Sequence, residues 1–411
     1  EVQTFKRDNG AVSVFTNDGQ PLLNAEQGEL SFQRTGSFQP GTSGQEVRGV
    51  DGRSLSPESG GRIGALLEVR DQDLPSFQED VDRLAAKVTE ELNAVHNQGT
   101  VGNAGQQEIV GSNPFPDAGA DLNASGTLEV AKVNANGGVT QEVRVDLSGG
   151  GINTVQDVVD QINTATDVGG NNPNLNASLN GDDKLAITST NNDGIVIDTS
   201  NARIGRDDGS GNSVAIGDTA EDTTGDGNRD RSVSHFFGLN NLFETPDNVT
   251  PEVNDPNLVT GDGTSAANAI EVRDDLSEDP NRVSRGVANT QVGAEALPAG
   301  DGTVMQNLAA TFEENVGFES GGNVSGRDTT LTNFASDIIQ FQASESSRLE
   351  QLASDRKDVV DNLEFRAESQ AGVNIDEELA RLQQFQQSFN ANARLVSTAQ
   401  QMFQSLSRAV A

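Results

Sequence analysis

The sequence of 411 residues contains no cysteine, tryptophan or tyrosine, and only two histidines, His96 and His235. Without cysteine the chain has no disulfide, thiolate metal site, cysteine nucleophile or iron–sulfur ligand. A hydrolase triad needs a histidine beside a nucleophile and an orienting acid, and neither histidine has a recognisable nucleophile motif nearby. The sequence therefore favours a protein that is not an enzyme, and it predicts no cofactor.

Basic residues are scarce as well, with 27 Lys and Arg against 63 Asp and Glu and a formal net charge of -36. This excess repels phosphate backbones and anionic lipids, so we expect no nucleic-acid partner and no membrane partner. No apolar run approaches the roughly 18 residues of a membrane span, and the start of the sequence shows no signal-peptide pattern. The acidic surface suits either an ordinary soluble protein or exposure to a salty medium, where salt screens repulsion between carboxylates.

One acidic loop is a weak candidate for calcium, because oxygen ligands alternate there with glycine: Asp222, Asp226, Asn228 and Asp230. The glutamate that closes such a loop is missing, since the twelfth position is Val233 or Phe237, depending on the starting residue. The default interpretation is a solvated acidic loop, and we predict no metal site. No phosphate-binding loop is present either, because Gly149–Gly151 lack the accompanying Lys and Ser/Thr.

Apolar spacing divides the N-terminal quarter into strands and a helix. Val12, Val14 and Phe15 lie between two Asn/Asp/Gly turns, which predicts a hairpin-like start. A helix follows, with Pro75 in its first turn and apolar residues every three or four positions: Leu74, Phe77, Val81, Leu84, Val88, Leu92 and Val95.

The middle of the chain is rich in Gly, Asn, Asp and Thr with short β-branched runs, which predicts an all-β or α+β insertion over 113–270. Within it, 127–198 resembles a small unit with one short helix around Val155–Ile162. The expected strands are 128–133, 143–147, 175–179, 185–187 and 195–197. Two long loops, 205–232 and 244–266, are expected to form exposed tips.

The C-terminal third returns to helical spacing from about residue 303, with a break at Ala371-Gly372. The last segment carries two seven-residue rows, which define the C-terminal seam and the predicted subunit interface: Ile375, Leu379, Leu382, Phe385, Phe389, Asn392, Val396, Ala399, Phe403 and Leu406. Such a seam must be covered by another helix, and a polar Asn392 would fix its register. The covering helix is either residues 331–363 of this chain, or a helix of another copy or of a segment absent from this chain.

Several motifs together carry a family resemblance. The run from Gly60 to Gly99 resembles the signature helix of the flagellar hook-associated protein 1 family, which forms the junction between hook and filament. Residues 235–243, 270–273 and 299–302 are similar to landmarks of that family, and 371–403 to the C-terminal helix shared by rod, hook and hook-associated proteins. Phe389 and Ala371 depart from this pattern, since the family usually has Tyr and Ser there. The family's N-terminal helices have no counterpart here, so we expect a chain lacking its N-terminal segment.

The resemblance implies an α+β multidomain, elongated protein with an α-helical bundle or coiled-coil core, inserted β-rich domains and a C-terminal assembly helix. The expected parts are 1–112 (β-rich segment and core helix), 113–270 (inserted outer domain), 271–370 (return to the helical core) and 371–411 (coiled-coil helix). The implied partners are sister copies in a ring, the hook protein, a second junction protein or the filament, and an export chaperone on the terminal helix. The implied location is the extracellular flagellum, reached through the flagellar export apparatus without a cleaved signal.

Two alternatives remain open at this stage. One is another flagellar axial protein such as a flagellin, although the helix from Gly64 to Gly99 argues against it. The other is a secreted calcium-binding or carbohydrate-binding β-domain protein, for which residues 113–270 would carry the ligand.

Overall fold

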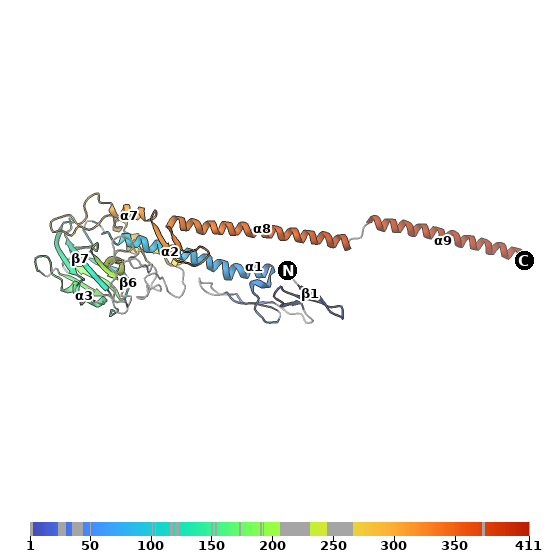
Figure 1. Ribbon diagram of the computed structural model, residues 1–411, viewed down its shortest axis with the longest axis horizontal. Helices are drawn as coiled ribbons and strands as arrows, with labels where there is room; N and C mark the ends of the chain where they lie inside the picture. The colour runs from blue at the N-terminus through green and yellow to red at the C-terminus, as the bar shows by residue number, and fades with distance from the viewer. Residues whose placement is uncertain are drawn as a thin grey trace. The chain divides into compact units, whose positions relative to one another are not determined.

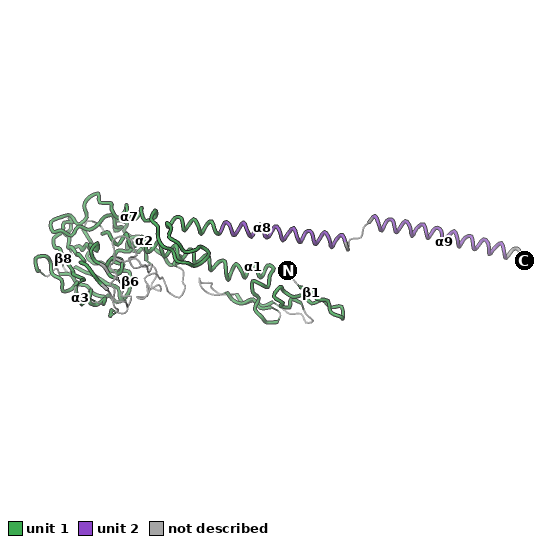
Figure 2. The backbone as a smooth tube through the Cα atoms, viewed as in Figure 1, with its two compact units in different colours: residues 1–341 green, residues 342–411 purple. Residues whose placement is uncertain are grey.

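The computed structural model describes most of the chain in two compact units, residues 1–341 and 342–411 (Figure 2). The described residues are 3–23, 30–34, 44–49, 51–100, 102, 104–115, 118–119, 123–148, 151–152, 154–171, 174–189, 191, 193–205, 231–244, 266–371 and 375–410. The calcium candidate at 222–230 lies outside them, as does most of both predicted long loops.

The chain begins with an antiparallel meander of β1 (Gln3–Lys6), β2 (Val12–Phe15) and β3 (Pro21–Leu23). Its two turns end in Gly10 and Gly19, whose φ angles of +84° and +82° favour glycine. The predicted hairpin is therefore confirmed. A short pair, β4 (Ser31–Phe32) with β5 (Val47–Arg48), follows.

A helical run then extends from residue 57 to 96. It comprises the 3-10 turn η1 (Pro57–Ser59), α1 (Gly61–Glu68), the π turn η2 (Val69–Asp73) and α2 (Leu74–His96). Pro75 is the second residue of α2, directly after the π turn, and it has no N–H to donate into the helical run. The predicted helix is thus confirmed, but the π turn before it was not predicted.

The strands between residues 108 and 232 form a β-rich body with its own core (Figure 1). One sheet has the order β6-β10-β9 and another β11-β7-β12-β13, with β8 also paired to β7. The strands are β6 (Glu108–Pro114), β7 (Asn123–Val133), β8 (Val139–Asp146), β9 (Leu175–Leu179), β10 (Lys184–Ser189), β11 (Gly194–Asp198), β12 (Ala202–Gly205) and β13 (Arg231–Ser232). All five strands expected between 127 and 198 are present.

Helix α3 (Val155–Thr164) packs its apolar side against this body. Its start is fixed by a capping box, in which Thr154 Oγ1 accepts from the Asp157 amide and the Asp157 carboxylate accepts from the Thr154 amide. Val155, Val158 and Ile162 are fully buried against β-strand residues such as Leu128 and Leu185. The 3.6-residue spacing of these apolar positions therefore matches the helix that forms.

Short elements lead from the β-rich body back to the helices. They are α4 (Val233–Phe237), β14 (Phe243–Glu244), α5 (Ala266–Ala269), β15 (Glu271–Val272), α6 (Asp274–Glu278) and the 3-10 turn η3 (Pro280–Arg282). A small apolar cluster, which includes Val133, Val139, Ala288 and Ala296, joins the following segment to β7 and β8.

The helical part of unit 1 resumes with α7 (Thr303–Thr311), the hairpin β16 (Asn315–Phe318) and β17 (Arg327–Thr330), and the first turns of α8 (Leu331–Ala371). Phe334 of α8 stacks on Phe318 of β16 with ring centroids 3.7 Å apart. Val81, Leu84 and Val88 of α2 pack against this cluster. The hairpin thus lies against α2 and the start of α8, and it forms a second core separate from that of the β-rich body.

In unit 2, α8 ends at Ala371, as the Ala-Gly pair predicted, and α9 (Ile375–Val410) follows. The mixture of helices and small sheets confirms an α+β protein, whereas the predicted domain boundaries at 112, 270 and 370 remain predictions. No helix in the described part of the chain is long and apolar enough to cross a membrane.

Candidate assembly surface

Helix α9 carries the C-terminal seam, and none of the described residues covers it. Every side chain described on α9, from Asp376 to Leu406, is exposed. Phe389 is 74% exposed and Phe403 77%. The apolar rows of α9 are therefore exposed in the described part of the chain.

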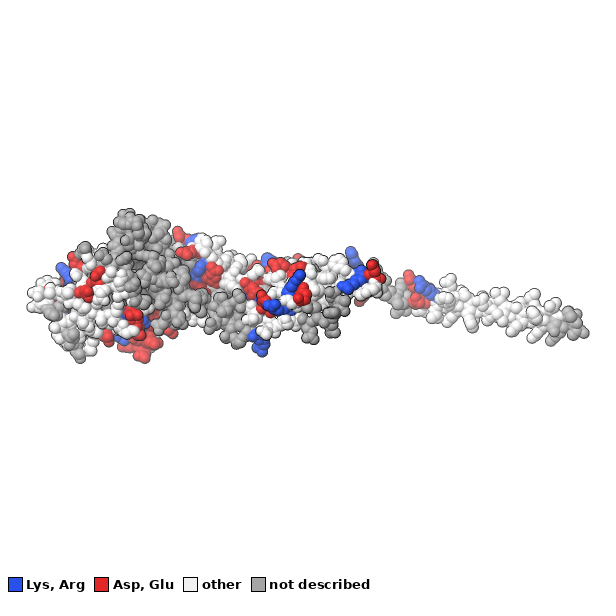
Figure 3. Space-filling model, turned by 90° about the horizontal axis from the view of Figure 1, so that it is seen from below, with Lys and Arg blue, Asp and Glu red and all other residues white. Residues whose placement is uncertain are grey.

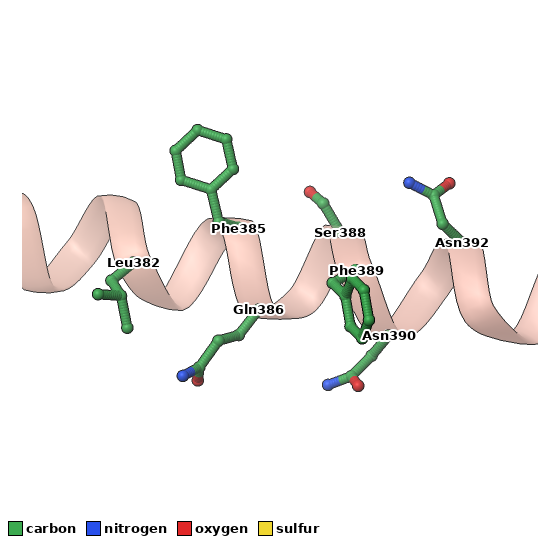
Figure 4. A pocket seen from close by; sticks show the side chains of 7 residues that line it. All are labelled: Leu382, Phe385, Gln386, Ser388, Phe389, Asn390 and Asn392. Carbon is green, nitrogen blue, oxygen red and sulfur yellow. The ribbon is translucent and has the colours of Figure 1, made fainter.

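The predicted seam residues all lie on this helix. Leu379, Leu382, Phe385, Asn392, Val396, Ala399 and Leu406 are exposed, and the side chain of Ile375 is outside the described part. Around Phe389 the surface has an open hollow, lined also by Leu382, Phe385 and Asn392 (Figure 4). Figure 4 shows Phe385 and Asn392 projecting from one side of the helix and Leu382 from the other. Residues three and four apart on an α-helix are neighbours, so the two rows run side by side as one stripe that a covering helix can meet.

Two apolar residues widen the seam near its C-terminal end and were not predicted as part of it. Leu395 and Met402 are 67% and 69% exposed, and they are seven residues apart. On a helix they lie beside Ala399, at the edge of the second row. A search for a third seven-residue row would have found them.

The seam region carries almost no charge, in contrast to the rest of the chain. Between Leu382 and Leu406 the one charged residue is Arg394, and the remaining polar positions are mostly Gln, Asn and Ser. Figure 3 shows this helix largely white on the face it displays. Copies of a chain with a net charge of -36 repel one another. This helix is a part of the chain where two copies can pack closely without adding to that repulsion.

Two further apolar faces are exposed on other helices. On α8, Val359, Leu363 and Phe365 are exposed. On α1, η2 and the start of α2 the exposed apolar residues are Ile63, Leu66, Val69, Leu74 and Phe77. Helices with an uncovered apolar face are marginal alone in water, so these faces add to the surface available for subunit packing.

His96 was weighed as a catalytic residue, and both of its ring nitrogens are engaged in the structure. The backbone amide of Ser284 donates to Nε2 at 2.9 Å, so Nδ1 carries the proton and donates to the Asn240 carbonyl at 2.6 Å. Burial lowers the pKa of His96, and nearby Arg273 lowers it further, against smaller opposing contributions from the Asn240 carbonyl and Asp275. A buried imidazole hydrogen-bonded at both nitrogens within the protein presents neither nitrogen to a substrate.

The described residues around the two histidines offer no set of metal ligands. Within the described residues there is no group of three His, Asp or Glu side chains that could hold an ion. His235 lies in the short helix α4, where it is buried next to Ser234.

Comparison with known proteins gives matches at both ends of the chain. Residues 1–108 match the family model of the flagellar hook-associated protein FlgK helical domain, and 367–409 match that of the flagellar basal body rod FlgEFG protein C-terminal region. Flagellar hook-associated protein 1 of Salmonella typhimurium is 32% identical over 84 residues, which is 20% of this chain and 15% of that protein. The protein of the same name from Salmonella typhi matches equally.

A solved structure of the flagellar hook junction protein FlgK from Burkholderia pseudomallei is also similar, at 21% identity over 48% of this chain and 37% of that one. Its TM-score is 0.20. The aligned segment spans only about a seventh of the curated Salmonella proteins.

Both matched models describe flagellar proteins, and they match the two ends of the chain. Over its first quarter the chain is similar to flagellar hook-associated protein 1, because the helical-domain model of that family matches there and both Salmonella proteins align over 84 residues. The family resemblance found in the motifs is thereby confirmed.

Proposed function

We propose that this chain is a junction subunit of the bacterial flagellum that joins hook to filament by packing its C-terminal seam against other helices. The observation that carries the proposal is the seam itself: an apolar, nearly uncharged stripe along α9 that nothing in the described chain covers. The family relationship supports the same conclusion from independent grounds. The chain acts by assembly and not by catalysis.

The physical basis is burial of apolar surface. Covering a Leu or Phe side chain contributes about 1.5–3 kcal/mol when it is buried completely. The exposed seam residues Leu382, Phe389, Val396 and Phe403 together offer several kcal/mol to an assembled state. A seven-residue repeat falls slightly short of two α-helical turns, so helices that share it wind around one another with a left-handed twist.

Asn392 supplies register. It occupies a seam position among apolar neighbours, and its amide is best satisfied when it meets a polar partner on the covering helix. Sliding the helices by one turn would bury that amide against apolar groups, at a cost of about 1–3 kcal/mol. We therefore propose that Asn392 selects one alignment of neighbouring helices.

The remaining partners follow from the same role. The subunit self-associates in a ring through head-to-tail contacts and contacts the hook protein on one side and a second junction protein or the filament on the other. Before export a chaperone covers α9, and the assembled protein is extracellular. The C-terminal coiled coil and the inserted outer domain belong to this proposal.

Complementation tests the function. A full-length version is expressed in a strain lacking the junction protein, and cells are inspected by electron microscopy for filaments attached to hooks. Phe389→Glu with Val396→Glu places two carboxylates in the seam and should abolish attachment. Gln387→Glu puts one carboxylate on the opposite side of the same helix and should leave attachment intact. Normal filaments in the double variant, with that protein present at the wild-type level, would refute the proposal.

A further inference from the structure

The β-rich body is attached to α2 by a cluster of buried polar residues, which we call the polar joint: Asn93, His96, Asn97, Ser234, Asn240, Asn241 and Ser284. The two apolar cores do not merge there, since one lies among the β-strands and α3 and the other among α2, α8 and the β16–β17 hairpin. Each of the seven residues is at most 7% exposed. Directional hydrogen bonds therefore hold the C-terminal end of α2 to the 234–243 segment.

The hydrogen bonds of the polar joint depend on one another. Asn97 accepts from the Ser234 hydroxyl at 2.8 Å and from the Asn240 amide at 2.9 Å. The Asn240 side chain donates to the carbonyls of His96 and Gly99, both at 3.1 Å, and to the Ser284 hydroxyl. His96 closes the circuit through Ser284 and the Asn240 carbonyl. A change in the hydrogen bonds of His96 consequently affects both segments bound to α2, the one with Asn240 and the one with Ser284.

We propose that the polar joint is a pH-operated latch: when His96 takes up a proton, the joint opens and the β-rich body loosens from α2. Protonation puts a hydrogen on Nε2, which then faces the N–H of Ser284, so that an acceptor becomes a second donor. The Ser284 amide loses its partner, and an imidazolium is left in a buried site. Both effects favour separation of the two segments.

The charged groups around His96 influence the pH at which its ring is protonated. Arg273 and Asp275 act on the ring with opposite signs, and Arg273 forms a close pair with Asp275 and a longer one with Glu244. Arg282 also pairs with Asp275. Asp301 accepts from the amide of Val287, three residues after Ser284.

Two further titratable groups lie on the elements around the joint. Glu91 is on α2 itself, and His235 is next to Ser234 on α4. With burial lowering the pKa of His96, the unfolded or opened form binds the proton first. The joint is therefore closed above about pH 6.5, the ordinary histidine value, and weakens progressively as the pH falls below it.

Hydrogen exchange on the full chain tests the latch. Protection factors at pH 7.5 and pH 5.0 are compared, with the intrinsic pH dependence of exchange removed. We expect peptides covering 93–99 and 284–288 to lose protection at pH 5.0 relative to pH 7.5, because the opened form binds the proton more tightly than the closed one. Peptides from α3 and β9 inside the β-rich core should keep theirs.

Matched variants separate His96 from other groups that titrate. His96→Gln keeps an acceptor near Ser284 but cannot be protonated in this range, so its protection should be independent of pH. His235→Gln removes the other histidine and should leave the loss unchanged. A loss in His96→Gln equal to that of the wild type, or no loss in the wild type, overturns the latch.

A measurement on the wild-type protein covers the case in which His96→Gln fails to fold. With two histidines in the chain, two imidazole Cε1–H signals can be followed by NMR as the pH is lowered. The latch requires the His96 signal to titrate at the same pH at which Ser284 loses protection. Midpoints separated by more than about one pH unit would contradict it.

Discussion

The guanidinium of Arg83 on α2 lies 5.2 Å from the centre of the Phe334 ring on α8. Its nitrogens also donate to the Asp80 carboxylate and to the carbonyls of Glu319, Gly321 and Val324. One side chain therefore binds the loop of the β16–β17 hairpin, a neighbouring turn of α2 and an aromatic ring. Asp80 completes the contact by accepting from the amides of residues 323 and 324.

The first prediction concerns this contact. Arg83→Met keeps much of the side-chain volume but leaves the carboxylate of Asp80, which is 1% exposed, without its ion-pair partner. Loss of one partner of a buried pair costs about 3 kcal/mol or more. Chemical denaturation followed by circular dichroism should show this decrease in the free energy of unfolding. Arg53→Met breaks the exposed pair with Asp51 and should change stability by less than about 0.5 kcal/mol.

Phe334 is the second target. Its ring is fully buried and stacked on Phe318, so Phe334→Ala should destabilise the protein by about 3–5 kcal/mol. Phe365→Ala is the matched control, because the same substitution on the same helix removes a ring that is 72% exposed. Thermal unfolding of both variants checks the prediction, and equal effects would contradict the packing described for the hairpin.

The third prediction concerns acid. Burial raises the pKa of Asp275, but hydrogen bonds and charge from Arg273, with the charge of Arg282, outweigh it and hold the pKa below the ordinary value of 3.8. Because the folded-state pKa is the lower one, the carboxylate stabilises the fold above pH 3.8 and loses this contribution as the pH falls below it.

Asp275→Asn should therefore cost about 2 kcal/mol at pH 7 and progressively less below pH 4. Unfolding free energies of wild type and variant between pH 3 and pH 7 provide the measurement. A difference that does not shrink below pH 4 would show that the carboxylate charge is not the cause.

Lys132 gives a prediction of opposite sign. Its side chain on β7 is fully buried, and its Nζ lies 3.0 Å from Asp193 Oδ2 without the alignment of a good hydrogen bond. Replacing a buried charge by an apolar group of similar length is often neutral or stabilising, so Lys132→Met should stay within about 1 kcal/mol of the wild type or exceed it. Asp193→Ala leaves the ammonium buried without its partner and should lower stability. The denaturation midpoint of Asp193→Ala should therefore lie below that of the wild type, and that of Lys132→Met close to it or above it.

An element could be predicted from the sequence where its buried apolar residues repeat at the spacing of a single strand or helix. The small unit from β7 to β11 and the helix α2 were predicted because their apolar residues repeat at the spacing of a strand or a helix. The C-terminal seam on α9 was visible for the same reason. The assignment of that seam to subunit contacts came from the family resemblance and remains a proposal.

Features held by contacts distant in sequence were missed. The β16–β17 hairpin carries Gly317 and Gly326 at its strands and several polar residues, and its burial comes from Phe334 and the apolar side of α2. The polar joint was also missed: its residues stood out only as family landmarks, because nothing in the spacing of Asn93, His96 and Asn240 indicates that they bond to one another. The π turn has no sequence signal that we identified.

That π turn has a consequence for the two helical segments it separates. Each α-helical residue advances the helix by about 100°, so one residue inserted in a wider turn rotates all later side chains by about that angle. Upstream, α1 packs so closely on η1 that a Cβ at Gly64 would lie 2.6 Å from the Pro57 carbonyl oxygen, and Leu67 is buried. Downstream, Leu74 faces solvent. The inserted residue thus sets the rotation of α2 about its axis independently of α1. One helical run can therefore pack its N-terminal part on η1 and turn Val81, Leu84 and Val88 of α2 toward Phe318 and Phe334.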